Sequence, residues 1–214
     1  MAQVLNTLAH EIRTPLAVSQ GYLKLYVDGR LATPDDQRRA FAQAREALGV
    51  IAGLCAEMSK VSALSEAGAP ALVERLDSSD FARDLQAAGD LAGAEWSDLP
   101  APGARIATNA PRDLVKALSV VVKAAFDEAK SAAHRVEVSR DGDHLVMRAG
   151  TPAALADLPA APDGSGATDL NVVRGGKGLS LIWATFVADQ HRIQMWSHQA
   201  HKASVGIRIP LVTV

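Results

Sequence analysis

The chain has 214 residues, of which 48% are hydrophobic, so it is long enough for one large or two small domains with an ample core. Its net charge of -2, with Lys and Arg spread along the sequence, argues against binding to nucleic acid or to an acidic membrane surface. The single cysteine, Cys55, excludes an internal disulfide framework and a cysteine-ligated zinc site, and we expect its side chain to be buried.

No apolar run approaches the roughly 20 residues of a membrane-spanning helix, and no signal peptide opens the sequence. We therefore expect a cytoplasmic protein with no membrane segment in this chain. Whether a sensor or membrane domain precedes it in a longer parent stays open.

The first part of the chain predicts a hairpin of two long helices. Residues 2–29 carry apolar or small side chains at alternating spacings of three and four, the heptad pattern of a helix that packs on other helices. These positions are Leu5, Leu8, Ile12, Pro15, Ser19, Tyr22 and Tyr26. Gly29 interrupts the pattern, Thr33 suits the N-cap of a second helix, and Pro34 suits its first position.

The second helix has a line of its own, made of Phe41, Ala44, Leu48, Ile51, Cys55, Met58 and Ser62 and widened by Leu54, Val61 and Leu64. Since one hairpin buries too little apolar surface, we expect two copies to pair into a four-helix bundle, which makes the protein a homodimer.

The chain after Pro70 predicts an α/β sandwich with mostly antiparallel strands. Its expected elements are helices over 80–92, 112–132 and 179–191 and strands over 134–140, 144–149, 193–197 and 204–210. Residues 150–176 have no periodicity and predict a long flexible loop. The fold class is thus α+β, with a helical domain at residues 1–70 and a sandwich domain at 71–214.

His10 is the candidate reactive residue of the first helix. With Leu8 and Ile12 on the packing seam, His10 falls on the opposite side, where solvent is expected, whereas a core histidine would occupy the seam. Pro15 removes a backbone donor in mid-helix and should kink the helix just beyond His10.

The neighbours of His10 suit phosphoryl chemistry. A neutral imidazole that attacks phosphorus needs one free nitrogen and an acceptor for the proton on the other nitrogen. Glu11 can be that acceptor, and Thr14, one turn along the same face, can orient a water or a phosphoryl oxygen. Arg13 could help to neutralise the group in transfer.

The run Leu8-Ala9-His10-Glu11-Ile12-Arg13-Thr14-Pro15-Leu16 resembles the phosphoacceptor box of sensor histidine kinases, and residues 58–68 resemble the end of that family's dimerisation and phosphotransfer domain. The resemblance implies that His10 is the phosphoacceptor, Glu11 its acid–base partner, and Thr14 the residue that family members use to dephosphorylate their partner. That partner is the receiver domain of a response regulator.

The second half is similar to the Bergerat-like ATP-binding domain of the same family. The best match is Gly175-Gly176-Lys177-Gly178-Leu179, a glycine-rich turn before a helix, in which Gly176 and Gly178 would hold phosphates. An ordinary tight turn explains these glycines about as well.

The resemblance also indicates a degenerate nucleotide site. It places Val120 and Ala124 where the family has a magnesium-binding Asn, and Arg148 where the family has the Asp that accepts from adenine. A hydrocarbon side chain cannot ligate magnesium, and arginine only donates. We therefore expect no cofactor, with ATP and magnesium possible only if the altered site still binds them. No pair of histidines has helical metal-ligand spacing, so no metal site is expected.

These features predict a two-component signalling protein that exchanges phosphate between His10 and a receiver aspartate, or removes phosphate from that aspartate. Two alternatives stay open. One is an ATP-dependent histidine kinase with an atypical nucleotide site, and the other is a non-catalytic pseudokinase scaffold.

Overall fold

The computed structural model describes residues 2–66, 74–88, 91, 93–97, 100, 102–129, 133–164, 167–169, 178–198 and 203–212. The chain divides into two compact units, Met1–Ala63 (unit 1) and Leu64–Val214 (unit 2). The predicted domain boundary, between residues 70 and 71, falls outside the described residues. None of the described helices combines the length and the apolar character that crossing a membrane requires.

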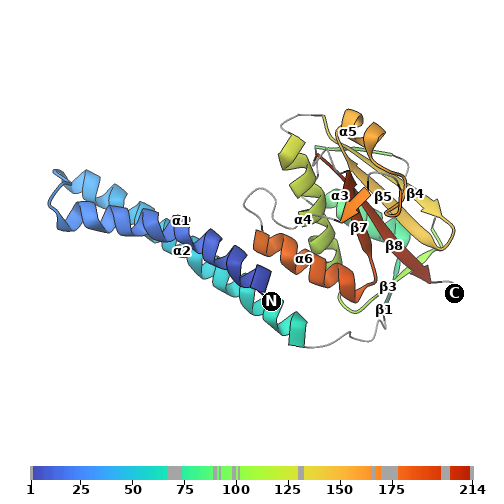
Figure 1. Ribbon diagram of the computed structural model, residues 1–214, viewed down its shortest axis with the longest axis horizontal. Helices are drawn as coiled ribbons and strands as arrows, with labels where there is room; N and C mark the ends of the chain where they lie inside the picture. The colour runs from blue at the N-terminus through green and yellow to red at the C-terminus, as the bar shows by residue number, and fades with distance from the viewer. Residues whose placement is uncertain are drawn as a thin grey trace. The chain divides into compact units, whose positions relative to one another are not determined.

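Unit 1 is the predicted helical hairpin, made of α1 (Ala2–Val27) and α2 (Pro34–Glu66) (Figure 1). Gly29 follows α1 with a φ of 65°, the left-handed conformation that ends many helices. The Asp36 N–H donates to the Thr33 hydroxyl (3.1 Å), which in turn donates to the Asp36 carboxylate (2.7 Å). Thr33 as N-cap and Pro34 as first helical residue are therefore confirmed.

The buried side of α2 differs from the predicted line. Its buried residues in the hairpin include Ala40, Ala44 and Ala47, whose small side chains allow close helix packing. Phe41 and Leu48 are exposed, and so is Cys55, which makes the prediction of a buried cysteine wrong. Ala44 was on the predicted line, but Phe41, Leu48 and Cys55 lie at the edge of the packed face.

Unit 2 is an α/β sandwich, as predicted. Its elements are β1 (Glu74–Asp77), α3 (Ser78–Ala87), β2 (Glu95–Trp96), β3 (Arg105–Thr108), α4 (Pro111–Ala129), β4 (Arg135–Asp141), β5 (His144–Gly150), α5 (Pro152–Asp157), β6 (Ala167–Asp169), α6 (Gly178–Gln190), β7 (Gln194–His198) and β8 (Ser204–Val212).

The strands form one sheet in the order β1-β3-β8-β5-β4-β2, and β7 joins it by pairing with both β8 and β6. Among the described strands only the β2–β4 pair is parallel, so the expectation of mostly antiparallel pairing is confirmed. Strand β8 pairs with β5 over its whole first part and with β7 and then β3 on its other edge.

Helices α4 and α6 contact each other on one side of the sheet, and α5 contacts β5 (Figure 1). The core between helices and sheet consists of large side chains that are almost fully buried. They include Phe81, Leu85, Leu114, Leu118, Leu145, Met147, Leu179, Leu181 and Ile207.

Several sequence predictions for unit 2 need correction. The segment 150–176, expected to be a structureless loop, contains α5 and β6. Thr151 caps α5 by accepting from the Ala154 N–H (3.2 Å), and Pro152 opens it. The short strands β1, β2 and β3 were not predicted, and the helix expected over 80–92 is α3, which starts earlier because Asp77 caps it.

Buried His191 joins the end of α6 to the segment before α4. Its Nδ1 donates to the Val187 carbonyl oxygen (2.7 Å), so the neutral ring accepts at Nε2 from the Thr108 hydroxyl (3.0 Å). The Thr108 oxygen accepts in turn from the Ala110 N–H (3.1 Å). Next in the chain, Arg192 ends α6 with a φ of 55°, the sole positive value at a non-glycine residue among the described positions.

A glycine in β8 leaves room for the largest buried side chain of the sheet. Gly206 pairs with Trp196 of β7, and a Cβ atom at Gly206 would lie 2.1 Å from Cε2 of the Trp196 ring. We expect Gly206→Ala to destabilise unit 2 by about 3 kcal/mol, because overpacking forces a well-packed core to shift. Urea unfolding measures the loss. Gly93→Ala is the control, since nothing lies within 4 Å of its Cβ position, and an equal loss in both variants would contradict the explanation.

Burial lowers the pKa of His191 below its ordinary value, and the hydrogen bond to Val187 only partly offsets this. The unfolded chain therefore binds a proton on this ring more readily than the folded chain does. We expect stability conferred by the neutral ring to fall as pH drops below about 6.5. Asp77, whose pKa the Ser79 hydroxyl and neighbouring N–H groups lower to about 2, loses its contribution only in stronger acid.

The urea midpoint of unit 2 should accordingly be lower at pH 5 than at pH 7.5. In His191→Gln, which cannot gain a proton, the difference between the two pH values should shrink. An unchanged difference in this variant would mean that other groups cause it.

Candidate functional site

Helix α1 presents His10 to solvent. Its imidazole is exposed, whereas Leu8 and Ile12, two residues to either side, are half-buried. Positions two apart on a helix are separated by about 200° around the axis, so His10 points away from the side that packs in the hairpin. The solvent-facing position predicted from the heptad pattern is the one observed.

The other residues predicted for this site lie on the same helix within about one turn. Arg13 and Thr14 are exposed, and Glu11 is half-buried. Thr14 lies four residues after His10, which puts it about 6 Å further along the axis on nearly the same face. One stretch of helix thus carries an imidazole, a carboxylate, a guanidinium and a hydroxyl within five consecutive positions.

Helix α1 continues through Pro15. Since proline has no N–H, Pro15 donates no backbone hydrogen bond within the helix. The kink expected just beyond His10 stays a prediction.

The two positions of α4 that the resemblance assigns to magnesium binding have apolar side chains. Ala124 is buried and Val120 is half-buried on α4. Lys116 lies one turn before Val120, and its Nζ stands 5.7 Å from the centre of the Trp183 ring of α6, a cation–π contact. The line of α4 formed by these three residues therefore offers no carboxylate or amide oxygen.

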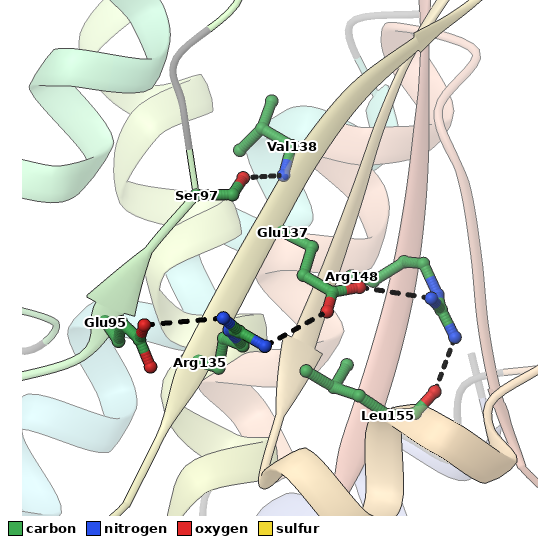
Figure 2. Close-up of polar contacts among 7 residues, drawn as sticks. All are labelled: Glu95, Ser97, Arg135, Glu137, Val138, Arg148 and Leu155. Atoms are coloured by element: carbon green, nitrogen blue, oxygen red, sulfur yellow. Dashed lines mark hydrogen bonds and ion pairs between the residues drawn. The ribbon is translucent and has the colours of Figure 1, made fainter.

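Arg148 is engaged in a chain of polar contacts on the side of β5 that α5 covers (Figure 2). Its Nη1 lies 3.1 Å from Glu137 of β4, and its Nη2 donates to the carbonyl oxygens of Leu155 (2.5 Å) and Leu158 (2.7 Å). Arg135 continues the chain to Glu137 (4.0 Å) and to Glu95 (3.4 Å).

Alternation along β5 separates Arg148 from the helix layer. Val146 and Arg148 share one face, and Val146 clusters there with Leu155 of α5 and with Trp196. Met147 and Ala149 lie on the other face and are fully buried. At the end of β5 the side chain directed toward the helix layer is thus Ala149, one position from the Arg148 expected from the sequence. Neither residue can accept a hydrogen bond through its side chain.

Sequence reasoning missed the partners of Arg148. Glu137 is its direct cross-strand neighbour in the β4–β5 ladder, and opposite charges at facing positions of a hairpin are the signal that could have revealed the pair. The two carbonyl groups at the end of α5 could not be foreseen, because α5 itself was not predicted.

The glycine-rich turn is only partly described. Gly178 is buried and opens α6, whereas Gly176 lies outside the described residues. Among the residues that the structure covers, no group of three or more His, Cys, Asp or Glu could hold a metal ion.

Comparison with protein-family models gives a match for the first part of the chain. The family model of the His Kinase A (phospho-acceptor) domain matches residues 1–65. Domains of this family in general dimerise and work with response regulators. No curated protein matches the chain.

Two solved structures share the fold of nearly the whole chain. The Acinetobacter baumannii histidine kinase AdeS superposes with a TM-score of 0.60 at 15% identity, over 94% of this chain and 98% of that one. Full-length ShkA, solved in complex with AMPPNP, gives a TM-score of 0.55 at 17% identity, over 98% of this chain and 46% of that one. The phospho-acceptor domain model thus covers the segment that carries His10, and the two solved structures share the fold of both units.

Proposed function

We propose that this chain is a dimeric histidine phosphotransfer module, in which His10 exchanges a phosphoryl group with the aspartate of a response-regulator receiver domain. The observation that carries the proposal is the exposed His10 with Glu11 and Thr14 beside it on one helix of a His Kinase A domain. An exposed imidazole can be reached by a second protein, which a buried one cannot.

The transfer is a displacement at phosphorus. One nitrogen of neutral His10 forms the N–P bond while the bond between phosphorus and the receiver's aspartate oxygen breaks, and the aspartate leaves as a carboxylate. The proton on the other nitrogen stays on the ring, whose positive charge Glu11 stabilises. Arg13 faces the solvent nearby and can offset the charge of the phosphoryl oxygens. The reverse step passes the group to a receiver.

Thr14 suits the competing reaction. Its hydroxyl lies one turn beyond His10 and can orient a water molecule toward the receiver's aspartyl phosphate, which releases inorganic phosphate. Such a chain transfers the phosphoryl group when His10 attacks the phosphorus and releases inorganic phosphate when water attacks it.

We infer that ATP is not the phosphoryl donor. Phosphoryl transfer from ATP depends on a metal held by oxygen ligands and on a positioned nucleotide. Val120 and Ala124 have no oxygen in their side chains, and Ala149 has no acceptor for an adenine amino group. Arg148 is engaged with Glu137 and α5. These described positions of unit 2 therefore do not fit ATP with magnesium, which disfavours the autokinase alternative. The scaffold alternative assigns no role to the group formed by His10, Glu11, Arg13 and Thr14.

Incubation with a receiver domain phosphorylated on its aspartate with ³²P tests the transfer. We expect label to reach the chain or to appear as inorganic phosphate, and we expect His10→Gln to remove transfer to the chain entirely. Glu11→Gln should slow transfer about 100-fold, the lower end of a general acid–base contribution. Thr14→Ala should lower phosphate release while sparing transfer. Label on the chain in His10→Gln would place the acceptor elsewhere.

Calorimetric titration of ATP with magnesium into the chain tests the nucleotide inference. We expect no heat of binding and no change in tryptophan fluorescence, since Trp183 lies on α6 against Lys116 of α4 and would report a ligand between these helices. Binding at micromolar concentration, with the fluorescence change, would restore the autokinase reading.

A further inference from the structure

Unit 2 has a groove with a volume of about 410 Å³ between α3 and α4. Small-molecule sites have volumes of about 300–1,000 Å³, so the groove is large enough to hold a small ligand. Its lining includes three side chains without polar atoms, which are Ala87 and Ala88 from the end of α3 and Val115 from α4. We call these three residues the apolar lining, because a ligand with an apolar part can bury that part against them.

The charged residues that line the groove have opposite signs on the two helices. Asp84 of α3 supplies a carboxylate, whereas Arg112 and Lys116 of α4 supply a guanidinium and an ammonium group. Arg112 and Lys116 are four residues apart, which places them about 6 Å apart along α4 on nearly the same face. The α4 side of the groove is therefore positive, and the α3 side is negative.

These three charges are not neutralised by neighbouring side chains. Within the described part of the chain, neither Asp84 nor Arg112 takes part in an ion pair or a side-chain hydrogen bond. The Lys116 ammonium group contacts the ring of Trp183, at 5.7 Å from the ring centre, and no described carboxylate. Two positive groups and one negative group are therefore available to a ligand in the groove.

We propose that this groove binds a free α-amino acid with an apolar side chain. The α-carboxylate pairs with Arg112 and Lys116, the α-ammonium group pairs with Asp84, and the side chain packs on the apolar lining. A simple anion is repelled by Asp84, and a simple cation is repelled by Arg112 and Lys116. A zwitterion is the class of small ligand that matches both sides of the groove.

The exposure of the charged residues sets the expected affinity. Asp84, Arg112 and Lys116 are all exposed, and exposed ion pairs are weak because water and salt screen them. Burial of the ligand's side chain has to supply much of the remaining affinity. We therefore expect a dissociation constant on the order of 1 mM for L-leucine. Glycine, which has no side chain to bury, should bind more weakly.

The bound amino acid connects elements of unit 2 that differ in sequence position. It joins α3 to α4 through the two sides of the groove, and it reaches α6 because the Lys116 ammonium group also contacts Trp183. Unit 2 thereby has a ligand of its own in place of the nucleotide that its altered positions disfavour. All three charged residues belong to unit 2, so the inference does not depend on the function proposed for His10.

Calorimetric titration of L-leucine into the full chain tests the proposal, together with two analogues that each lack one charge. N-acetyl-L-leucine has no ammonium group, and L-leucinamide has no carboxylate. We expect a heat of binding for L-leucine and at least tenfold weaker binding of both analogues. The proposal is overturned if L-leucine does not bind at concentrations well above the millimolar range, or if either analogue binds as tightly as L-leucine.

Matched variants locate the ligand in the groove. Arg112→Gln and Asp84→Asn should each weaken L-leucine binding at least tenfold, because each removes one of the pairing charges. Arg83→Gln is the control, since Arg83 adjoins Asp84 but pairs with Asp80 (2.7 Å) and does not line the groove. These side chains are exposed, so all three variants should keep the urea midpoint of unit 2. Unchanged binding in Arg112→Gln and Asp84→Asn, or an equal loss in Arg83→Gln, would contradict the proposal.

Discussion

The packing around strand β8 depends on Gly206, which has no side chain. Strand β8 pairs with β5 along one edge and with β7 and β3 along the other, so three neighbours fix its position. Gly206 lets the Trp196 ring lie directly on the strand, and the Trp196 Nε1–H then donates to the Pro159 carbonyl oxygen (2.9 Å). This contact ties the segment after α5 to the sheet. The position of α5, and with it the environment of Arg148, follows from the space above Gly206.

The same face of the sheet bears on our proposal that unit 2 keeps a histidine kinase fold without binding a nucleotide. Arg148 binds the carbonyl ends of α5, and Glu137 balances its charge. On its other face β5 directs Met147 and Ala149 into the core, where both are buried. The fold is maintained by packing between helices and sheet, which needs no ligand, so the loss of magnesium and adenine contacts that we propose would cost the domain little of its structure.

Local signals in the sequence predicted most of the fold, and long-range pairing caused the errors. The heptad spacing, the Thr33 cap and the exposed His10 follow from neighbours along one helix. The strands β1 to β3 are short and gain their stability from distant partners, so composition could not reveal them. On α2, two overlapping apolar lines compete, and only the position of α1 decides that Ala47 is buried and Leu48 is not. The sequence assigned the adenine position to Arg148, whereas the neighbouring Ala149 is directed toward the helix layer. A shift of one residue along a strand moves the side chain to the other face of the sheet.

The four residues proposed for phosphoryl transfer lie within five consecutive positions of α1. Their mutual geometry is set by the rise and twist of a single helix. The residues proposed for the reaction are therefore encoded by one short segment of the gene. Selection could change the helices and strands of unit 2 one residue at a time, toward binding or regulation, while the phosphoacceptor is inherited intact.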